Sequence, residues 1–175
     1  MSKKTPILAW LFASQLGAAL AAEPSLPATV GIVRAELAKG FVPGCSMPEL
    51  ERPDAYWTPS RDQVLGIERR LPDHLAELNS RGDLPVKLSL KGYARQYTGV
   101  TYGTKQFYYV YFLPAPDHPT SLSQFYIACD GGPKYWAMLF DPQALSFGDP
   151  IFSMSYTGPK RVEKPSRPDL PGNDI

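Results

Sequence analysis

Cysteine and histidine are scarce in this 175-residue chain, which contains two of each. A serine-hydrolase triad needs a nucleophile, a base and an orienting group, yet no Gly-x-Ser-x-Gly or Ser-x-x-Lys arrangement accompanies His74 or His118. We expect His74 to face solvent on a helix and His118 to lie in a proline-rich loop. Two distant histidines without a cysteine cluster also make a metal site improbable. The sequence therefore predicts no metal and no cofactor.

Basic residues are not in excess either, because 18 Lys and Arg stand against 17 Asp and Glu. Without a basic excess, the counterion release and surface-potential attraction that drive binding to nucleic acid and anionic membranes are lost. The composition thus favours a protein, a glycan or a small molecule as partner, and argues against nucleic acid.

Long hydrophobic runs are missing apart from Ile7 to Leu20, about fourteen residues, whereas a bilayer span needs roughly 20. Lys3 and Lys4 precede this run and Ala19-Leu20-Ala21-Ala22 follows it, which is the pattern of a secretory signal peptide. We predict a signal peptide over residues 1–21, periplasmic or secreted localisation, and no integral membrane segment after cleavage. No cysteine follows the cleavage region before Cys45, which argues against a lipid anchor.

The two cysteines, Cys45 and Cys129, form an even count that an oxidising compartment would pair. We expect one disulfide, which would stabilise the fold by roughly 4 to 5 kcal/mol in the chain-entropy account. The alternative is a reactive thiol at Cys129. That cysteine ends an apolar run, where desolvation of the thiolate opposes nucleophilic use.

Helical signals concentrate in the middle of the chain. Thr58-Pro59-Ser60, with Gln63 three residues after Ser60, predicts a helix start with a capping box. Apolar residues then recur at spacings of three and four, and Pro72 predicts a kink within this pattern. They are Val64, Ile67, Leu71, Leu75 and Leu78. A shorter helix is expected behind Thr29, and a loop from Pro43 to Trp57.

After residue 86 the chain becomes rich in Tyr, Phe, Val and Thr, punctuated by glycine, which predicts strands. The expected strands are 93–101, 106–113, 125–129, 135–140 and 151–156. In the second, both alternating sets of side chains are apolar, so we expect this strand to be central. Asp130-Gly131-Gly132-Pro133 and Asp141-Pro142 are typical of turns.

One helix followed by consecutive strands predicts an α+β domain, a kinked helix packed on a five-stranded antiparallel sheet. We divide the chain into a signal peptide (1–21), an N-terminal segment and loop (22–57), the helix-plus-sheet domain (58–156) and a disordered tail (157–175). The tail has too few aliphatic residues to offset ordering entropy. The element order resembles that of cystatin-like and PepSY-like domains.

Three local patterns add a family resemblance: Tyr93-Ala94-Arg95-Gln96-Tyr97, Cys129-Asp130-Gly131-Gly132, and Tyr135-Trp136 leading to Phe140-Asp141-Pro142. Over about residues 58–156 the chain resembles a set of small secreted proteobacterial proteins of uncharacterised function. The resemblance implies no activity.

Aromatic density suggests a site, because a single helix covers only one face of a sheet. Tyr and Trp are enriched in interfaces, so we predict a binding surface on the sheet. Its candidate residues are Tyr93, Arg95, Tyr97, Tyr109, Tyr111 and Trp136. The structural alternative is cross-strand packing under the N-terminal segment or the tail.

The preferred function is non-enzymatic binding to another envelope or secreted protein, as an inhibitor, an immunity-type neutraliser or an assembly factor. The alternative is a small cell-wall glycan-acting enzyme or ligand carrier. It would use Asp130 and Asp141 as acid and base, with Arg95 holding an anionic group. Both aspartates are also ordinary turn residues.

Overall fold

The computed structural model describes residues 25–40, 50–115, 121–128 and 131–153. Several sequence-based predictions concern residues outside these ranges. They are the signal peptide, the Cys45–Cys129 disulfide, His118, Asp130 and the tail after residue 156. Within the described ranges, no helix combines the length and the apolar character that crossing a membrane requires.

The sheet is mixed rather than purely antiparallel, which corrects the predicted five-stranded antiparallel arrangement. Strands β1, β3, β4, β5 and β6 follow one another in this order, while β2 pairs with β3 and β7 with β5. Among the described strands, only β1 runs parallel to its neighbour, with Val30 opposite Arg95. The strands are β1 (Val30–Ile32), β2 (Ala55–Trp57), β3 (Tyr93–Tyr102), β4 (Lys105–Pro114), β5 (Trp136–Asp141), β6 (Ser146–Phe147) and β7 (Ile151–Phe152).

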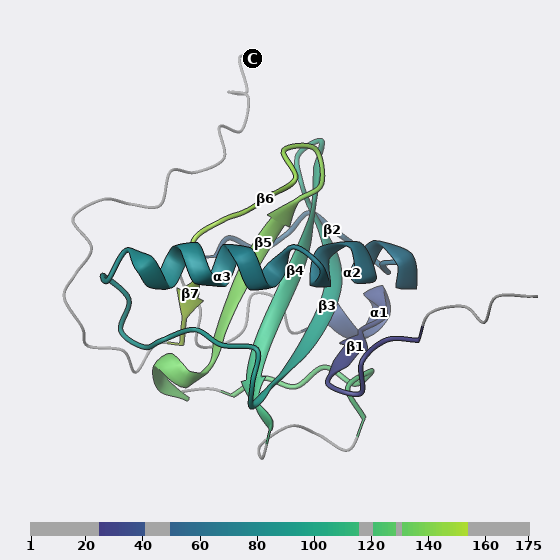
Figure 1. Cartoon of the computed structure of the whole chain (residues 1–175). Helices are drawn as coiled ribbons and strands as arrows, with labels where there is room; N and C mark the ends of the chain where they lie inside the picture. The colour runs from purple at the N-terminus through teal and green to yellow at the C-terminus, as the bar shows by residue number, and fades with distance from the viewer. Residues whose placement is uncertain (1–24, 41–49, 116–120, 129–130, 154–175) are drawn as a thin grey trace, which may run out of the picture.

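The bent helix forms where the sequence predicts it. Helix α2 (Arg61–Glu68) begins at Ser60, whose hydroxyl accepts from the Gln63 amide while the Gln63 side chain accepts from the Ser60 amide. Helix α3 (Leu71–Ser80) follows directly, with Pro72 in its first turn, where a missing backbone donor costs no helical hydrogen bond. All five predicted apolar positions are buried. In Figure 1 the two segments cross one face of the sheet.

Four predictions for the N-terminal part and the short strands differ from the structure. The segment behind Thr29 forms β1 and the four-residue helix α1 (Ala35–Ala38) instead of one helix. The expected loop up to Trp57 contains β2. Residues 125–128 form no strand, and β7 ends at Phe152. Strands of two or three residues are too short to show a detectable period in the sequence. They also form only where a neighbouring strand pairs with them.

Both faces of the sheet are buried, which answers the question left open by the sequence. The helix-covered face carries Tyr97, Tyr108, Val110, Phe112 and Trp136 against α2 and α3. The opposite face carries Val100, Phe107, Tyr109 and Tyr111 beneath residues 121–128, which we call the strap, together with Leu50 and Tyr56. The strand β4 is central, as predicted, since it lies between β3 and β5.

Candidate functional site

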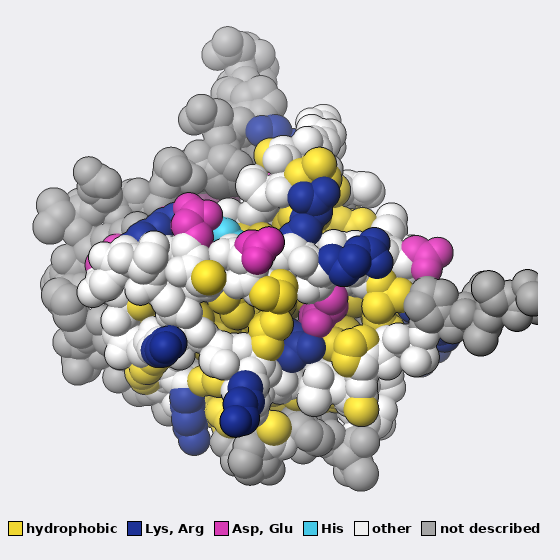
Figure 2. All heavy atoms as spheres, viewed as in Figure 1, with side chains coloured by type: hydrophobic (Ala, Val, Ile, Leu, Met, Phe, Trp, Pro, Cys, Tyr) yellow, Lys and Arg dark blue, Asp and Glu magenta, His cyan; other side chains and the backbone are white. Residues whose placement is uncertain are grey.

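An open hollow of about 390 Å³ lies where the bent helix meets the β5–β6 hairpin. We call it the Arg69 groove. Figure 2 views the molecule from the helix side, and basic side chains there adjoin hydrophobic ones below the hairpin. The lining residues are Gln63, Gly66, Ile67, Arg69, Arg70, Tyr108, Phe140, Pro142 and Leu145.

The floor of the groove is apolar and fixed by the sheet. Tyr108 and Phe140 are directly opposite each other in the β4–β5 ladder, with ring centroids 6.0 Å apart, and Ile67 lies against them from α2. Trp57 braces Tyr108 by an edge-on contact at 4.8 Å. Burial raises the pKa of Tyr108, so its hydroxyl stays protonated at neutral pH.

Gly66 lies in the interior of α2, where residues that form helices strongly are preferred. Glycine at such a position costs about 1 kcal/mol relative to alanine. The packing does not demand it: the nearest atom that an added Cβ would meet is Arg69 Nη2 at 3.9 Å, an ordinary contact distance. The missing side chain instead leaves the helix side of the groove open.

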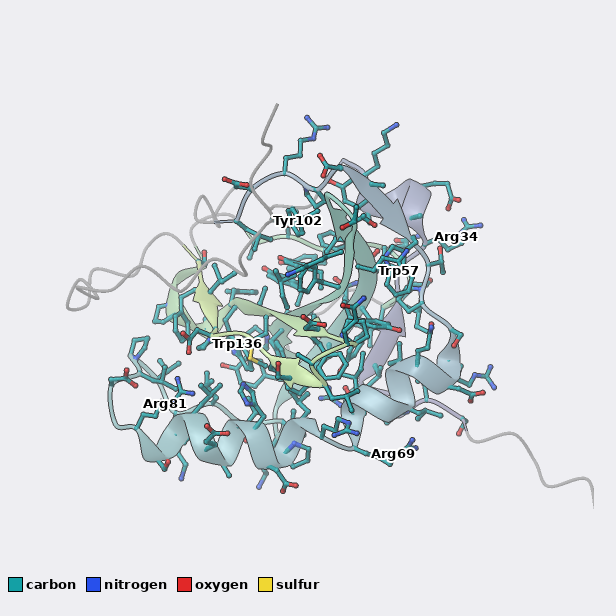
Figure 3. All side chains as sticks on the ribbon, turned by 90° about the horizontal axis from the view of Figure 1, so that it is seen from above. Arg34, Trp57, Arg69, Arg81, Tyr102 and Trp136 are labelled. Atoms are coloured by element: carbon teal, nitrogen blue, oxygen red, sulfur yellow. The ribbon has the colours of Figure 1, made fainter. Side chains whose placement is uncertain are left out.

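Two adjacent cations border the opening. Arg69 and Arg70 end the α2 segment, and both are exposed. Neither forms an ion pair or a side-chain hydrogen bond with any described residue. The neighbouring carboxylate, Glu68, is bound to Arg95 on the inner side. Figure 3 shows Arg69 where the two helical segments meet.

The hairpin contributes a strained apolar residue to the same groove. Leu145 has a φ of 53°, the one positive φ at a non-glycine residue in the described ranges. It is also the single large hydrophobic side chain described as exposed, at 55%. A left-handed conformation costs a residue with a Cβ roughly 1–2 kcal/mol. The preceding turn is held by Asp141, whose Oδ1 accepts from the amides of Gln143 and Ala144 at 2.7 and 3.1 Å.

The predicted binding residues do not come together on one surface. Arg95 is buried and donates through Nε and Nη2 to both oxygens of Glu68 at 2.8 Å. The Tyr97 hydroxyl donates to the same carboxylate. Burial, and then the negative charge of Glu68, raise the pKa of Tyr97 well above its usual range. The arginine is thus fully engaged in an internal ion pair, not placed to hold an external anion.

The other predicted residues are also internal. Trp136 stacks on Phe112 at 3.5 Å, and the partly buried Tyr93 packs edge-on against Trp136. On the opposite face, Tyr109 and Tyr111 stack on Phe125 of the strap at 6.4 and 6.2 Å. An exposed aromatic sheet face is therefore not formed, and any partner of these residues would have to displace the elements that cover them.

The remaining candidate residues, His74 and Asp141, interact with neighbouring parts of the fold. His74 was expected to face solvent, but its side chain is 14% exposed and stacks on Phe147 at 4.9 Å. Burial lowers the pKa of His74, and Glu77 partly offsets this effect. Asp141 serves the hairpin turn, whereas Asp130 lies outside the described residues. In the described part of the chain, no three His, Cys, Asp or Glu side chains lie close enough to hold a metal ion.

A second hollow, of about 540 Å³, lies between α1 and β2. Its lining balances Glu36 and Asp54 against Lys39 and Arg52, so it offers no net charge to a ligand. The Arg69 groove is therefore the better candidate site.

Sequence reasoning missed the Arg69 groove because its parts lie far apart in the chain. The glycine inside α2 and the Arg69-Arg70 pair before Pro72 were available signals. The strained backbone of Leu145 could not be predicted, because leucine is not a residue type that indicates such a conformation. Comparisons with protein-family models, curated proteins and solved structures found no match to this chain.

Proposed function

We propose that the chain is an exported, non-enzymatic binding protein that engages another envelope or secreted protein through the Arg69 groove. Its role would be that of an inhibitor, an immunity-type neutraliser or an assembly factor. The observation that carries the proposal is an apolar floor bordered by two exposed arginines that have no acidic partner among the residues the structure describes.

The chemistry of the groove supports binding over catalysis. The described residues that line it include no carboxylate, histidine or cysteine. Tyr108 is held in its protonated form by burial. General acid–base catalysis needs a group poised near the working pH, and nucleophilic catalysis needs an activated nucleophile. The groove provides neither, whereas apolar area with a few convergent polar groups is typical of binding sites.

Charge reversal at the groove tests the proposal. The full chain and its Arg69→Glu variant are used as baits in an envelope fraction of the parent organism, and captured proteins are quantified by mass spectrometry. We expect a partner that wild type enriches and Arg69→Glu recovers at least tenfold less, because arginine anchors dominate many interfaces.

Arg34→Glu is the matched control, since Arg34 is also exposed but lies at the start of α1, away from the groove. Both variants must show wild-type circular dichroism and melting. Equal recovery of every protein by Arg69→Glu and wild type would refute the proposal. Tyr109→Ala and Tyr111→Ala would be poor probes, because both tyrosines are buried and their removal would destabilise the fold.

A further inference from the structure

We propose that the Arg69 groove recognises an extended acidic peptide segment that places one large apolar side chain on the floor and carboxylates against Arg69 and Arg70. This inference rests on the proposed function and specifies the chemistry of the partner. The segment would belong to the partner protein.

The charge of the groove selects carboxylates over polyanions. Arg69 and Arg70 lack a described acidic partner, and no acidic residue lines the groove with them. The planar guanidinium matches the carboxylate in a bidentate pair. Binding to anionic membranes uses clusters of about 4–8 basic residues, and nucleic-acid binding uses a basic patch or stripe, so two arginines are too few for either.

The shape of the groove selects an apolar anchor on an extended chain. Its hollow of about 390 Å³ is open along the helix and floored by Ile67, Tyr108 and Phe140. This volume lies within the range of about 300–1,000 Å³ that is typical of ligand pockets, which is enough room for one large side chain. Leu145 stands exposed at the rim, where an anchor on the floor would bury it.

Two residues that are unfavourable for their local backbone structure line this groove. Gly66 weakens α2 although an added Cβ would meet no close contact. Leu145 adopts a left-handed backbone that glycine or asparagine would accept more readily. Proteins retain such unfavourable residues mainly at functional sites, where the gain lies in function and not in stability. The two positions flank the space assigned to the anchor from opposite sides.

The test is selection from a random twelve-residue peptide library on the full chain, followed by fluorescence anisotropy with the selected peptides. We expect peptides with a central aromatic or leucine residue flanked by Asp or Glu. Their affinity should fall at least tenfold, about 1.4 kcal/mol, in Arg69→Glu and stay within twofold in Arg34→Glu.

Gly66→Leu separates occlusion from unfolding. Leucine is a better helix former than glycine, so the variant should melt at a higher temperature than wild type yet bind the peptides at least tenfold more weakly. Leu145→Asn should likewise keep the fold and weaken binding. Gly40→Ala is the matched control, because Gly40 lies outside the groove and has open space around it.

The contrary results are distinct. Groove-dependent selection of neutral or basic peptides would overturn the acidic assignment and leave the proposed function standing. Peptides that bind equally to wild type, Arg69→Glu and Gly66→Leu would overturn both. Groove-dependent binding to phosphatidylglycerol vesicles without peptide binding would overturn the peptide assignment and show that the groove binds a membrane surface. Groove-dependent self-association in sedimentation would replace the peptide by a second copy.

Discussion

Glu68 connects the bent helix to the sheet face that the helix covers. Its carboxylate accepts two hydrogen bonds from Arg95 and one from Tyr97, and its side chain is 11% exposed. Arg95 also donates to the carbonyl of Tyr93 at 3.0 Å and to the Thr29 hydroxyl at 3.3 Å. The pair thereby connects α2 to β3 and to the segment before β1. Arg95 is buried and Glu68 is largely buried, and each has hydrogen-bonding partners.

Removing one member of this pair should be far more damaging than removing both. Glu68→Ala leaves the Arg95 guanidinium buried without a counter-charge, so we expect a loss of about 3–5 kcal/mol of unfolding free energy. Glu68→Leu combined with Arg95→Met should lose much less, because no uncompensated charge remains. Urea unfolding of the single and double variants measures both values. A double variant as unstable as Glu68→Ala would contradict the explanation.

The sequence singled out Arg95 and Tyr97 but assigned them the wrong surroundings. The motif Tyr93 to Tyr97 marked residues of unusual chemistry within a strand. Their partner is 27 to 29 positions earlier, on a helix whose orientation over the sheet is set by tertiary packing. Residue types could therefore be recognised, whereas the pairing that removes them from the surface could not.

The strap is the element that most changes the predicted architecture. Its apolar residues 125–128 resemble a strand, but its backbone groups bond to a side chain instead of a neighbouring strand. Gln96 Nε2 donates to the carbonyls of Leu122 and Gln124, and Gln96 Oε1 accepts from the Tyr126 amide at 3.0 Å. The strap also passes so close to β1 that a Cβ on Gly31 would lie 2.2 Å from the Leu122 carbonyl oxygen.

Gln96→Leu should detach the strap. Three polar groups of the strap would lose their partners, which costs about 1–3 kcal/mol for each group that stays buried, so opening becomes favourable. We expect faster hydrogen exchange and proteolysis within 121–128 and increased binding of a hydrophobic dye, with α2 and α3 still protected.

Thr98→Val is the matched control for this change. Thr98 lies two residues further along the same face of β3, and its buried hydroxyl has no described hydrogen-bond partner. Replacing an unpaired hydroxyl by a methyl group should leave stability equal or higher. If Gln96→Leu and Thr98→Val showed the same protection across the strap, the side-chain amide would not be what holds it.

Elements defined by local chemistry were predictable, and elements defined by partners were not. The capping box at Ser60 and the apolar spacing from Val64 to Leu78 lie within one segment, so the sequence located α2 and α3. By contrast, β1 exists because it pairs with β3, and β6 because it returns along β5. The Arg69 groove forms between α2 and the β5–β6 hairpin, so its existence also depends on this pairing.

At the scale of the whole molecule, a sheet that is covered on both faces leaves its ends and edges as places for recognition. The aromatic residues that suggested a surface serve instead as two cores. Many are tyrosines, whose hydroxyls must be buried with the rings. This composition makes the stability of the molecule sensitive to alkali.

Burial raises the pKa of six tyrosines, and each of these shifts changes the stability of the fold with pH in the same direction. They are Tyr56, Tyr97, Tyr102, Tyr108, Tyr109 and Tyr111. In the unfolded chain tyrosine ionises near pH 10, while the folded state resists ionisation. The unfolded state then binds fewer protons, so stability is complete below pH 10 and falls as pH rises above it. For Tyr111, whose pKa is raised to about 12, the loss at pH 12 is on the order of 2 kcal/mol.

We therefore expect absorbance at 295 nm to show that the six tyrosines with a raised pKa ionise together above pH 10, in step with the loss of circular dichroism. Tyr111→Phe, which removes one of the buried hydroxyls, should make the decline of unfolding free energy with pH less steep, even though it also removes the hydrogen bond that the Ala128 amide donates at 3.3 Å. All ten tyrosines ionising near pH 10 while the circular dichroism stays native would contradict the prediction. That result would mean that the two aromatic cores admit water, and that the covered sheet faces are accessible to a partner after all.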